Sequence, residues 1–469
     1  MTFPESDKQY IEDIEPLRVA VIGSGPAGIY AAEALTRQQQ VPVHVDIMDR
    51  LPTPYGLVRY GVAPDHLKIK GVVRALRQVL EHPDVHFLGG VEFGTDLSRA
   101  DLARTHHAVV YATGAAVDRR MGIPGEDLPG SFAATDFVNW YCAHPDSALD
   151  QFVLNSEEVA VVGAGNVAID VARILLKGAD ELSHTDIPQP VLDVLASGRV
   201  RTVHLLARRG PLQAKFTSPE LRELLSLPGV DVDVRAEQID LDPATVDAGE
   251  LGAGRLSRAV RTNLKLLREH VDPPAREGPR TLRLHFWTRP LEVQGDENGV
   301  SGLRVERTRL ASDGSLVGTG KTAELDVGMV LRSVGYASVP LPEVAFDDRS
   351  RTVPQEEGRV LDAKGDVVRG DYVVGWIKRG PSGVIGTNKS DAAATIRSLL
   401  EDAPALREAA GELLPLEKVL DEHGPVVRSN YQDWLRIDAE EARQAEELGR
   451  GERVKLHGWH AYRRVLDGH

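Results

Sequence analysis

The sequence predicts an α/β fold of two domains, each built on a strand, a glycine-rich turn and a helix. A chain of 469 residues is too long for one ordinary hydrophobic core. Glycine-rich turns follow β-branched runs at two places, beginning at Gly23 and at Gly163. Hydrophobic residues make up 42% of the chain and charged residues 27%, which is typical of a soluble globular protein.

The first glycine-rich turn lies in the segment RVAVIGSGPAGIYAAEALTR. Gly23 permits a tight turn, Gly25 lets the backbone approach a pyrophosphate, and Gly28 lets the helix pack closely on the strand. The N-terminus of the following helix offers free N–H groups and a positive dipole end to phosphates. The next expected strand, VHVDIMD, ends at Asp49, where an acidic residue typically binds ribose hydroxyls. This pattern predicts a dinucleotide with an unphosphorylated ribose; the alternative is a purely structural turn.

The second turn lies in EVAVVGAGNVAIDVARILL, where Gly163, Gly165 and Ala168 are the three small residues. The strand expected beside it reads TVHLLARRG and ends in Arg208 and Arg209 instead of an acid. Paired guanidinium groups suit a dianionic phosphate, so this site is predicted to prefer NADP over NAD. The alternative is a solvated basic turn.

The single cysteine, Cys142, limits the chemistry. One thiol excludes an intrachain disulfide and a CxxC redox pair, and an iron–sulfur cluster needs about four thiolates. The net charge of −15 argues against a nucleic-acid partner. No metal site is expected. The first sixteen residues are acidic and unlike a signal or transit peptide, so we expect a cytoplasmic location.

Several longer segments match one known family. They are GSGPAG (23–28), PTPYGLVRYGVAPDHLKIK (52–70), YATGA (111–115), IPGEDLPGS (123–131), GAGNVAIDVARILL (163–176), ARRGPLQAKFTSPELRE (207–223) and GWIKRGPSGVIGTNKSDA (375–392). On these segments the chain resembles adrenodoxin reductase-type ferredoxin–NADP reductases, especially the actinobacterial members.

The resemblance implies a fold of two Rossmann-like dinucleotide-binding domains of the glutathione reductase type. The NADP-binding domain, residues 116–336, is then inserted into an FAD-binding domain formed by residues 1–115 and 337–469. The two chain crossings, near YATGA (111–115) and SVGYAS (333–338), are expected to form a hinge.

The resemblance also implies which residues hold the cofactors. Those expected at FAD are Ala27, Asp49, Gly56, Leu57, the main chain at Phe93, and the late loop residues Trp376, Gly383, Val384 and Ile385. Those expected at NADP are Gly165, Asn166, Val167, Ala168, Arg208 and Arg209, with Arg119 and Glu220 as further candidates. Family members usually carry glutamate where this chain has Asp49, and the shorter side chain keeps the charge.

His66 and Glu223 match family positions near the stacked nicotinamide and flavin rings, so they are the candidate catalytic residues. The alternatives are that His66 caps a turn and that Glu223 is an ordinary helix-surface charge. The resemblance implies hydride transfer from NADPH to flavin N5, then single-electron transfer to a ferredoxin, which in turn supplies acceptors such as haem-thiolate monooxygenases. Two other hypotheses stay open: a subunit that donates to another fixed redox partner, and a redox-idle, nucleotide-sensing flavoprotein.

The segment GRLSRAVRTNLKLLREH carries cations at helical spacing. They are Arg255, Arg258, Arg261, Lys265 and Arg268. On an acidic chain, such a helix face is a candidate docking site for an acidic ferredoxin. The alternative is a solvated helix face.

Overall fold

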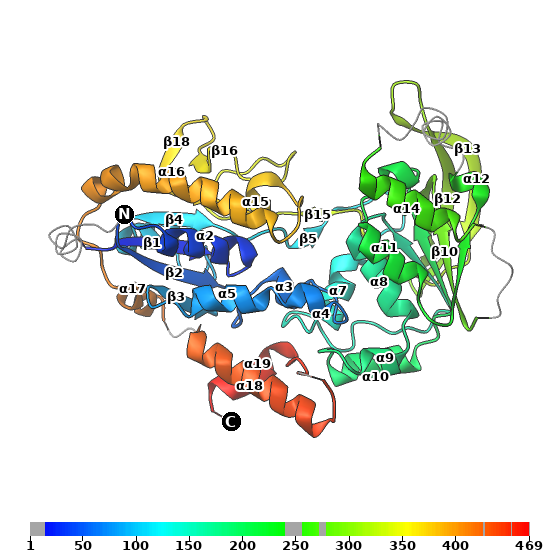
Figure 1. The fold of residues 1–469 in the computed structure, drawn as a ribbon, viewed down its shortest axis with the longest axis horizontal. Helices are drawn as coiled ribbons and strands as arrows, with labels where there is room; N and C mark the ends of the chain where they lie inside the picture. Colours follow the sequence, from blue (N-terminus) through cyan, green and yellow to red (C-terminus); the bar gives the residue numbers. More distant parts are fainter. Residues whose placement is uncertain (1–14, 240–255, 272–277, 425–426, 452, 469) are drawn as a thin grey trace. The chain divides into compact units, whose positions relative to one another are not determined.

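The computed structural model describes residues 15–239, 256–271, 278–424, 427–451 and 453–468 (Figure 1). The chain divides into two compact units. Unit 1 comprises Met1–Val62, His66–Val117 and Tyr336–His469, and unit 2 comprises Ala63–Asp65 and Asp118–Gly335. One unit is thus inserted into the other along the chain, with the main crossings at 117/118 and 335/336. The expected boundaries, 115/116 and 336/337, stay a prediction for the domains that bind the cofactors.

Unit 1 is built on an eight-stranded sheet in the order β16-β17-β18-β4-β1-β2-β3-β19. The five central strands are parallel: β1 (Leu17–Ile22), β2 (Val43–Asp49), β3 (Val85–Gly89), β4 (Ala108–Tyr111) and β18 (Val367–Val373). The short strands β16 (Gln355–Glu356), β17 (Arg359–Leu361) and β19 (Ser429–Asn430) add antiparallel edges.

Both faces of this sheet are buried, which explains the continuous apolar run in β1. Val19 and Val21 pack into the core on one face with α2 and α16, whereas Ala20 and Ile22 pack into a second core on the other face. The helices of unit 1 are α2 (Pro26–Arg37), α3 (Leu57–Tyr60), α4 (Leu67–Lys70), α5 (Val73–Leu80), α6 (Arg99–Thr105), α15 (Trp376–Arg379), α16 (Thr387–Ala409), α17 (Leu416–Glu422), α18 (Tyr431–Glu447) and α19 (Gly458–Leu466).

Unit 2 contains a six-stranded parallel sheet in the order β6-β14-β7-β8-β10-β9. Its strands are β6 (Ser131–Ala133), β7 (Glu158–Val162), β8 (Thr202–Leu206), β9 (Val230–Val234), β10 (Arg280–His285) and β14 (Met329–Arg332). An antiparallel sheet of β11 (Thr288–Asp296), β12 (Gly299–Leu310) and β13 (Leu316–Leu325) follows β10. At the two main chain crossings, the strands β5 (Val117–Asp118) and β15 (Tyr336–Ala337) form a separate pair.

The described helices of unit 2 are α7 (Ala134–Tyr141), α8 (Asn166–Leu176), α9 (Ala179–Leu182), α10 (Gln189–Ser197), the 3₁₀ helix η1 (Pro211–Gln213), α11 (Ser218–Leu225), α12 (Ala236–Ile239) and α14 (Arg258–Arg268). Among them, α8 packs on β7, β8 and β10, and α7 packs on β6 and β14. Across the described parts of both units, no helix has the length and apolar character that a membrane crossing requires.

Candidate cofactor sites

The first glycine-rich turn joins β1 to α2 in unit 1. A Cβ atom at Gly23 would lie 2.6 Å from the Ala112 carbonyl oxygen, and one at Gly28 only 2.0 Å from the Gly23 oxygen. A Cβ atom at Gly25, in contrast, would meet no atom within 4 Å. Packing therefore requires glycine at positions 23 and 28, whereas the open space at Gly25 is what close approach of a pyrophosphate needs.

Asp49 lies at the carboxyl end of β2 and fastens this turn. One carboxylate oxygen accepts hydrogen bonds from the backbone N–H (2.8 Å) and hydroxyl (2.7 Å) of Ser24, and the other accepts from Leu51 N–H (3.0 Å). The Val91 N–H donates to the Asp49 carbonyl (3.0 Å), so the segment that contains Phe93 runs past this end of the sheet. The Phe93 ring itself is buried against Tyr111.

A second segment of unit 1 reaches the same turn. The Tyr55 N–H donates to the Ser24 carbonyl (3.0 Å), and Gly56 follows with a φ of +48°. A Cβ atom at Gly56 would lie 2.9 Å from the Cα atom of Gly25. Gly56 therefore has to be glycine for both its backbone conformation and this close approach. Leu57 comes next, as the first residue of α3.

The late glycine-rich loop is the third segment of unit 1 that reaches the first glycine-rich turn. Gly375 has a φ of +77°, and a Cβ atom there would lie 2.6 Å from the Cβ atom of Ala27. Its N–H donates to the carboxylate of Asp391 on α16 (2.6 Å), which also pairs with Lys378 (3.0 Å) and Arg379 (3.3 Å). Asp391 was missed in the sequence analysis, although it stands in the matching segment that ends KSDA.

The rest of this loop presents backbone and one apolar side chain to open space. Val384 is 68% exposed, and Gly383 and Gly386 beside it are exposed as well. The indole N–H of Trp376 donates to the Ser382 carbonyl (3.2 Å), which closes the loop on itself. Ile385 packs partly against the core, and α16 begins two residues later at Thr387.

In the second glycine-rich turn, in unit 2, one glycine is again required by packing and another again faces open space. A Cβ atom at Gly163 would lie 2.1 Å from the Ser333 carbonyl oxygen, whereas one at Gly165 would meet nothing within 4 Å. Ala168 is fully buried where α8 packs on the sheet, and Val167 is partly exposed. The Asn166 side-chain oxygen accepts a hydrogen bond from Thr217 N–H (2.8 Å), which ties the start of α8 to the start of α11.

Arg208 and Arg209 follow β8, and their side chains are exposed. Their backbone is held: the Arg208 carbonyl accepts from the Thr308 hydroxyl (2.7 Å), and the Arg209 carbonyl accepts from Trp287 N–H (3.2 Å). Two guanidinium groups on a fixed backbone at the end of β8 are available to an anion. Arg119 is exposed at the beginning of unit 2, and its N–H donates to the Gly335 carbonyl (2.8 Å).

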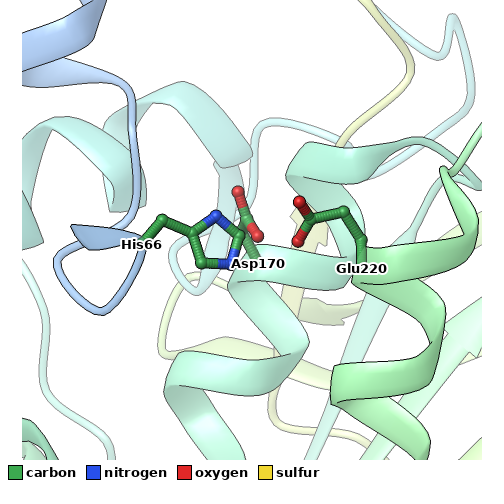
Figure 2. A group of neighbouring side chains, drawn as sticks. All are labelled: His66, Asp170 and Glu220. Carbon is green, nitrogen blue, oxygen red and sulfur yellow. The ribbon is translucent and has the colours of Figure 1, made fainter. Parts of the chain in front are cut away.

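Glu220 and Glu223 both lie on α11 and face Arg173 of α8 and Lys177, the residue just after α8, respectively. Glu220 is 3.7 Å from the guanidinium of Arg173, and Glu223 is 3.4 Å from Lys177 Nζ. Figure 2 shows the carboxylates of Glu220 and Asp170 turned toward each other, and Asp170 pairs with Arg173 at 2.7 Å. Glu223 is therefore more than an isolated surface charge, since it belongs to an ion-pair network within unit 2.

Arg173 is fully buried and holds this network together. It forms two hydrogen bonds with Asp65 (2.8 and 2.9 Å), and Lys177 adds a third (2.7 Å). Burial alone would raise the pKa of Asp65, but the hydrogen bonds from Arg173 and Lys177 hold that pKa well below its usual range. The pair therefore stays charged at neutral pH. Asp65, Arg173 and Lys177 were not predicted from the sequence as site residues, although all three stand in or beside the matching segments.

His66 immediately precedes α4 in unit 1, and its side chain is buried. The imidazole makes no capping hydrogen bond to α4; the Ile69 N–H instead donates to the backbone carbonyl of His66 (3.1 Å). His66 is therefore the N-cap residue of α4 through its backbone carbonyl, and its catalytic role stays a prediction.

The cationic helix is α14, which begins at Arg258 after the cap residue Ser257. Arg258, Arg261, Lys265 and Arg268 are exposed on it, whereas Leu264 and Leu267 are buried. The predicted fifth cation, Arg255, lies outside the described residues. Lys265 is 3.9 Å from Glu269, and the remaining charges of this face extend along the exposed side of the helix.

Comparison with known proteins agrees with this architecture. The sequence model of the pyridine nucleotide-disulphide oxidoreductases matches residues 17–246. The chain is 42% identical to NADPH-ferredoxin reductase FprA of Mycobacterium tuberculosis over 85% of this chain and 86% of that protein. It is 39% identical to the mitochondrial NADPH:adrenodoxin oxidoreductase of Arabidopsis thaliana over 95% and 94%. A solved structure of Mycobacterium tuberculosis FprA in complex with NADPH superposes with a TM-score of 0.87, at 40% identity, over 97% of this chain and 100% of that one.

The fold and the two glycine-rich turns define the class: an oxidoreductase with two dinucleotide-binding domains. Within that class, the identities over nearly the whole chain are specific. The chain belongs to the adrenodoxin reductase-type ferredoxin–NADP reductase family. The resemblance stated from the sequence is therefore confirmed, as is the fold class.

Proposed function

We propose that the protein is an FAD-dependent NADPH:ferredoxin oxidoreductase. The observation that carries the proposal is the approach of Gly56 to Gly25 and of Gly375 to Ala27, which brings three distant segments to one end of the sheet in unit 1. Ligands of open α/β sheets bind at this carboxyl end of the strands. Unit 2 adds a second open glycine-rich turn followed by two exposed arginines. The relatives named NADPH-ferredoxin reductase and NADPH:adrenodoxin oxidoreductase support the same reaction.

The FAD site is assigned to unit 1. Gly25 leaves room for the pyrophosphate at the N-terminus of α2. Asp49, at the end of β2, accepts hydrogen bonds from Ser24 of the same turn and is proposed to bind the ribose hydroxyls. The other residues proposed to hold FAD are Ala27, Gly56, Leu57, the main chain near Phe93, and Trp376 with Gly383, Val384 and Ile385. The exposed Val384 and the glycines beside it suit a flat ring that packs against backbone.

The NADP site is assigned to unit 2. The N-terminus of α8, from Gly165 to Ala168, receives the pyrophosphate, and Arg208 and Arg209 receive the 2′-phosphate. Arg119 and Glu220 are proposed as further contacts. Glu223 and, in unit 1, His66 are each proposed to contact a bound cofactor. The network around Arg173 fixes the position of α11 and thereby of Glu223.

Bound FAD supplies the exchange between the two-electron chemistry of NADPH and the one-electron chemistry of an iron–sulfur partner. The chain itself binds, orients and shields the two cofactors. Its one cysteine, Cys142, is buried in the core of unit 2, so no thiol pair takes part. A protein without disulfides suits a reducing compartment, and we propose a cytoplasmic location.

The proposal is tested with purified ferredoxins as electron acceptors. We expect the FAD-loaded protein to reduce at least one [2Fe–2S] or [4Fe–4S] ferredoxin with NADPH, measured by loss of the visible absorbance of the cluster. A protein that reduces small dyes but none of a broad set of ferredoxins would indicate a different partner.

We propose that the exposed face of α14 orients the ferredoxin. Replacing Arg258 and Arg261 with glutamate is expected to lower kcat/KM for ferredoxin by about tenfold or more at low salt, because steering depends on the sign of the surface potential. Added salt should narrow the difference from the parent protein. Reduction of a small uncharged dye should be unchanged.

The matched control is the double replacement of Arg309 and Lys321 with glutamate, which alters the net charge equally on exposed positions of β12 and β13. If both double variants lose ferredoxin activity equally, net charge and not the α14 face is responsible.

A further inference from the structure

The C-terminal helices α18 and α19 are joined to α3 by a buried ion pair. The guanidinium of Arg59 and the carboxylate of Glu441 form two hydrogen bonds, one of 3.0 Å and one shorter. Arg59 is 6% exposed and Glu441 is 0% exposed. Figure 1 shows α18 and α19 as an orange and red pair at the end of the chain.

Further polar contacts surround this pair. The Tyr462 hydroxyl on α19 accepts a hydrogen bond from Arg59 (3.3 Å), lies 3.1 Å from the Tyr60 hydroxyl, and donates to the Leu456 carbonyl (3.1 Å). Lys455 Nζ donates to the backbone carbonyl of Arg59 (2.6 Å). The C-terminal segment therefore holds both the side chain and the backbone of Arg59.

Arg59 belongs to the turn that we place in the FAD site. Its N–H donates to the Gly56 carbonyl (3.0 Å), and Gly56 in turn lies against Gly25. The neighbouring Tyr55 packs its ring edge-on against Trp434 of α18, with 5.7 Å between centroids. One face of the Tyr55–Gly61 turn thus meets the first glycine-rich turn, and the other meets the C-terminal helices.

Because Arg59 is charged, its buried position depends on the presence of Glu441. A buried guanidinium without its carboxylate is strongly unfavourable, so Arg59 is stable in this position only while Glu441 faces it. Two apolar side chains in the same positions would pack as well, and neither would carry a buried charge that needs a partner. Loss of the Glu441 contact would favour an Arg59 side chain in water, and Arg59 is tied to Gly56 by the hydrogen bond from its N–H.

We propose that Glu441 and Tyr462 are positioning residues for FAD. By holding Arg59, the docked α18–α19 pair keeps the Tyr55–Gly61 turn against Gly25, so FAD retention and helix docking are coupled. This inference rests on the FAD site proposed above and assigns a role to the C-terminal segment, which the sequence analysis left without one.

The first test is Glu441→Gln, which keeps the shape of the side chain and removes its charge. If the docked form falls to about a tenth of the population, the apparent Kd for FAD rises about tenfold, because affinity scales with the competent fraction. Tyr462→Phe should give a smaller rise, about threefold. The apparent Kd of both variants is measured by equilibrium dialysis of the apoprotein with FAD. The visible circular dichroism of the bound flavin should also change in Glu441→Gln.

The matched control is Glu447→Gln on the same helix. Glu447 is exposed and pairs only with Arg443 among the ion pairs of the described residues, so FAD affinity should equal that of the parent. The KM for NADPH should be unchanged in all three variants, because unit 2 is not altered. FAD affinity in Glu441→Gln equal to that of Glu447→Gln would overturn the proposal.

A second measurement uses the unaltered chain and does not depend on how the variants fold. Coupling is reciprocal, so removing FAD should speed amide hydrogen exchange in α18 and α19 while β7 and β8 stay protected. Unchanged exchange in both helices would overturn the coupling. If the protein binds FAD and NADPH bleaches it, the proposed function stands even when this coupling fails; if it binds no FAD, the proposed function itself is wrong.

Discussion

Gly25→Val is expected to give a folded protein that no longer retains FAD. The backbone at Gly25, with φ −69° and ψ 176°, is one that any residue adopts, and the structure leaves open space where the side chain would extend. Valine therefore fits the protein but occupies the volume that the pyrophosphate needs. We expect FAD affinity to fall at least about 100-fold, equivalent to ~2.7 kcal/mol. Equilibrium dialysis measures the loss, and far-UV circular dichroism reports the fold.

Two glycines serve as controls for this result. Gly411→Val also places valine in open space within unit 1, outside the proposed site, and should retain FAD. Gly28→Val would put a Cβ atom 2.0 Å from the Gly23 oxygen and should destabilise the fold itself. A Gly25→Val protein that purifies with its full complement of FAD would show that the cofactor lies elsewhere.

The double replacement of Arg208 and Arg209 with alanine is expected to abolish the preference for NADPH over NADH. A hydrogen bond to a charged group contributes about 1.5–3 kcal/mol, so two arginines on a 2′-phosphate account for roughly 10²- to 10⁴-fold in kcat/KM. Activity with NADH should change less than about threefold, since that cofactor lacks the phosphate. Steady-state rates with both cofactors and a small dye measure the discrimination.

Alanine at Arg309 and Lys321 removes two exposed cations of the same unit and is the control. It should leave the discrimination intact. An equal loss of NADPH and NADH activity in the Arg208 and Arg209 variant would mean that these residues support the fold or the shared pyrophosphate, and not the 2′-phosphate.

The parts of this architecture that depend on local pattern could be predicted from the sequence. A β-branched run, a glycine-rich turn and a helix rich in small residues follow one another within about 20 residues, and this local order identifies a strand, a turn and a helix. Both turns and the strands before them, β1 and β7, were therefore located correctly. The cationic helix also follows from spacing alone. The order of several longer segments that match the family, and not any single turn, indicated the family.

The parts that depend on pairing between distant side chains could not be predicted from the sequence. Arg59 and Glu441 stand 382 residues apart, and no local pattern indicates that either is buried. The same holds for Arg173 with Asp65, 108 residues apart, and for Asp391, which sits on a helix after the loop that it fastens. The partner of a buried charge is brought next to it only by the tertiary fold, and only this pairing offsets the cost of burying the charge.

NADPH is expected to reduce an FAD held by this chain. Anaerobic titration of the purified, FAD-loaded protein with NADPH tests it most directly, by following the visible absorbance of the flavin. We expect the absorbance to bleach with about one equivalent of NADPH, since each NADPH delivers two electrons. NADH should be much less effective if Arg208 and Arg209 bind the 2′-phosphate as proposed. A flavin band that persists with excess NADPH would show that NADPH does not reduce this flavin.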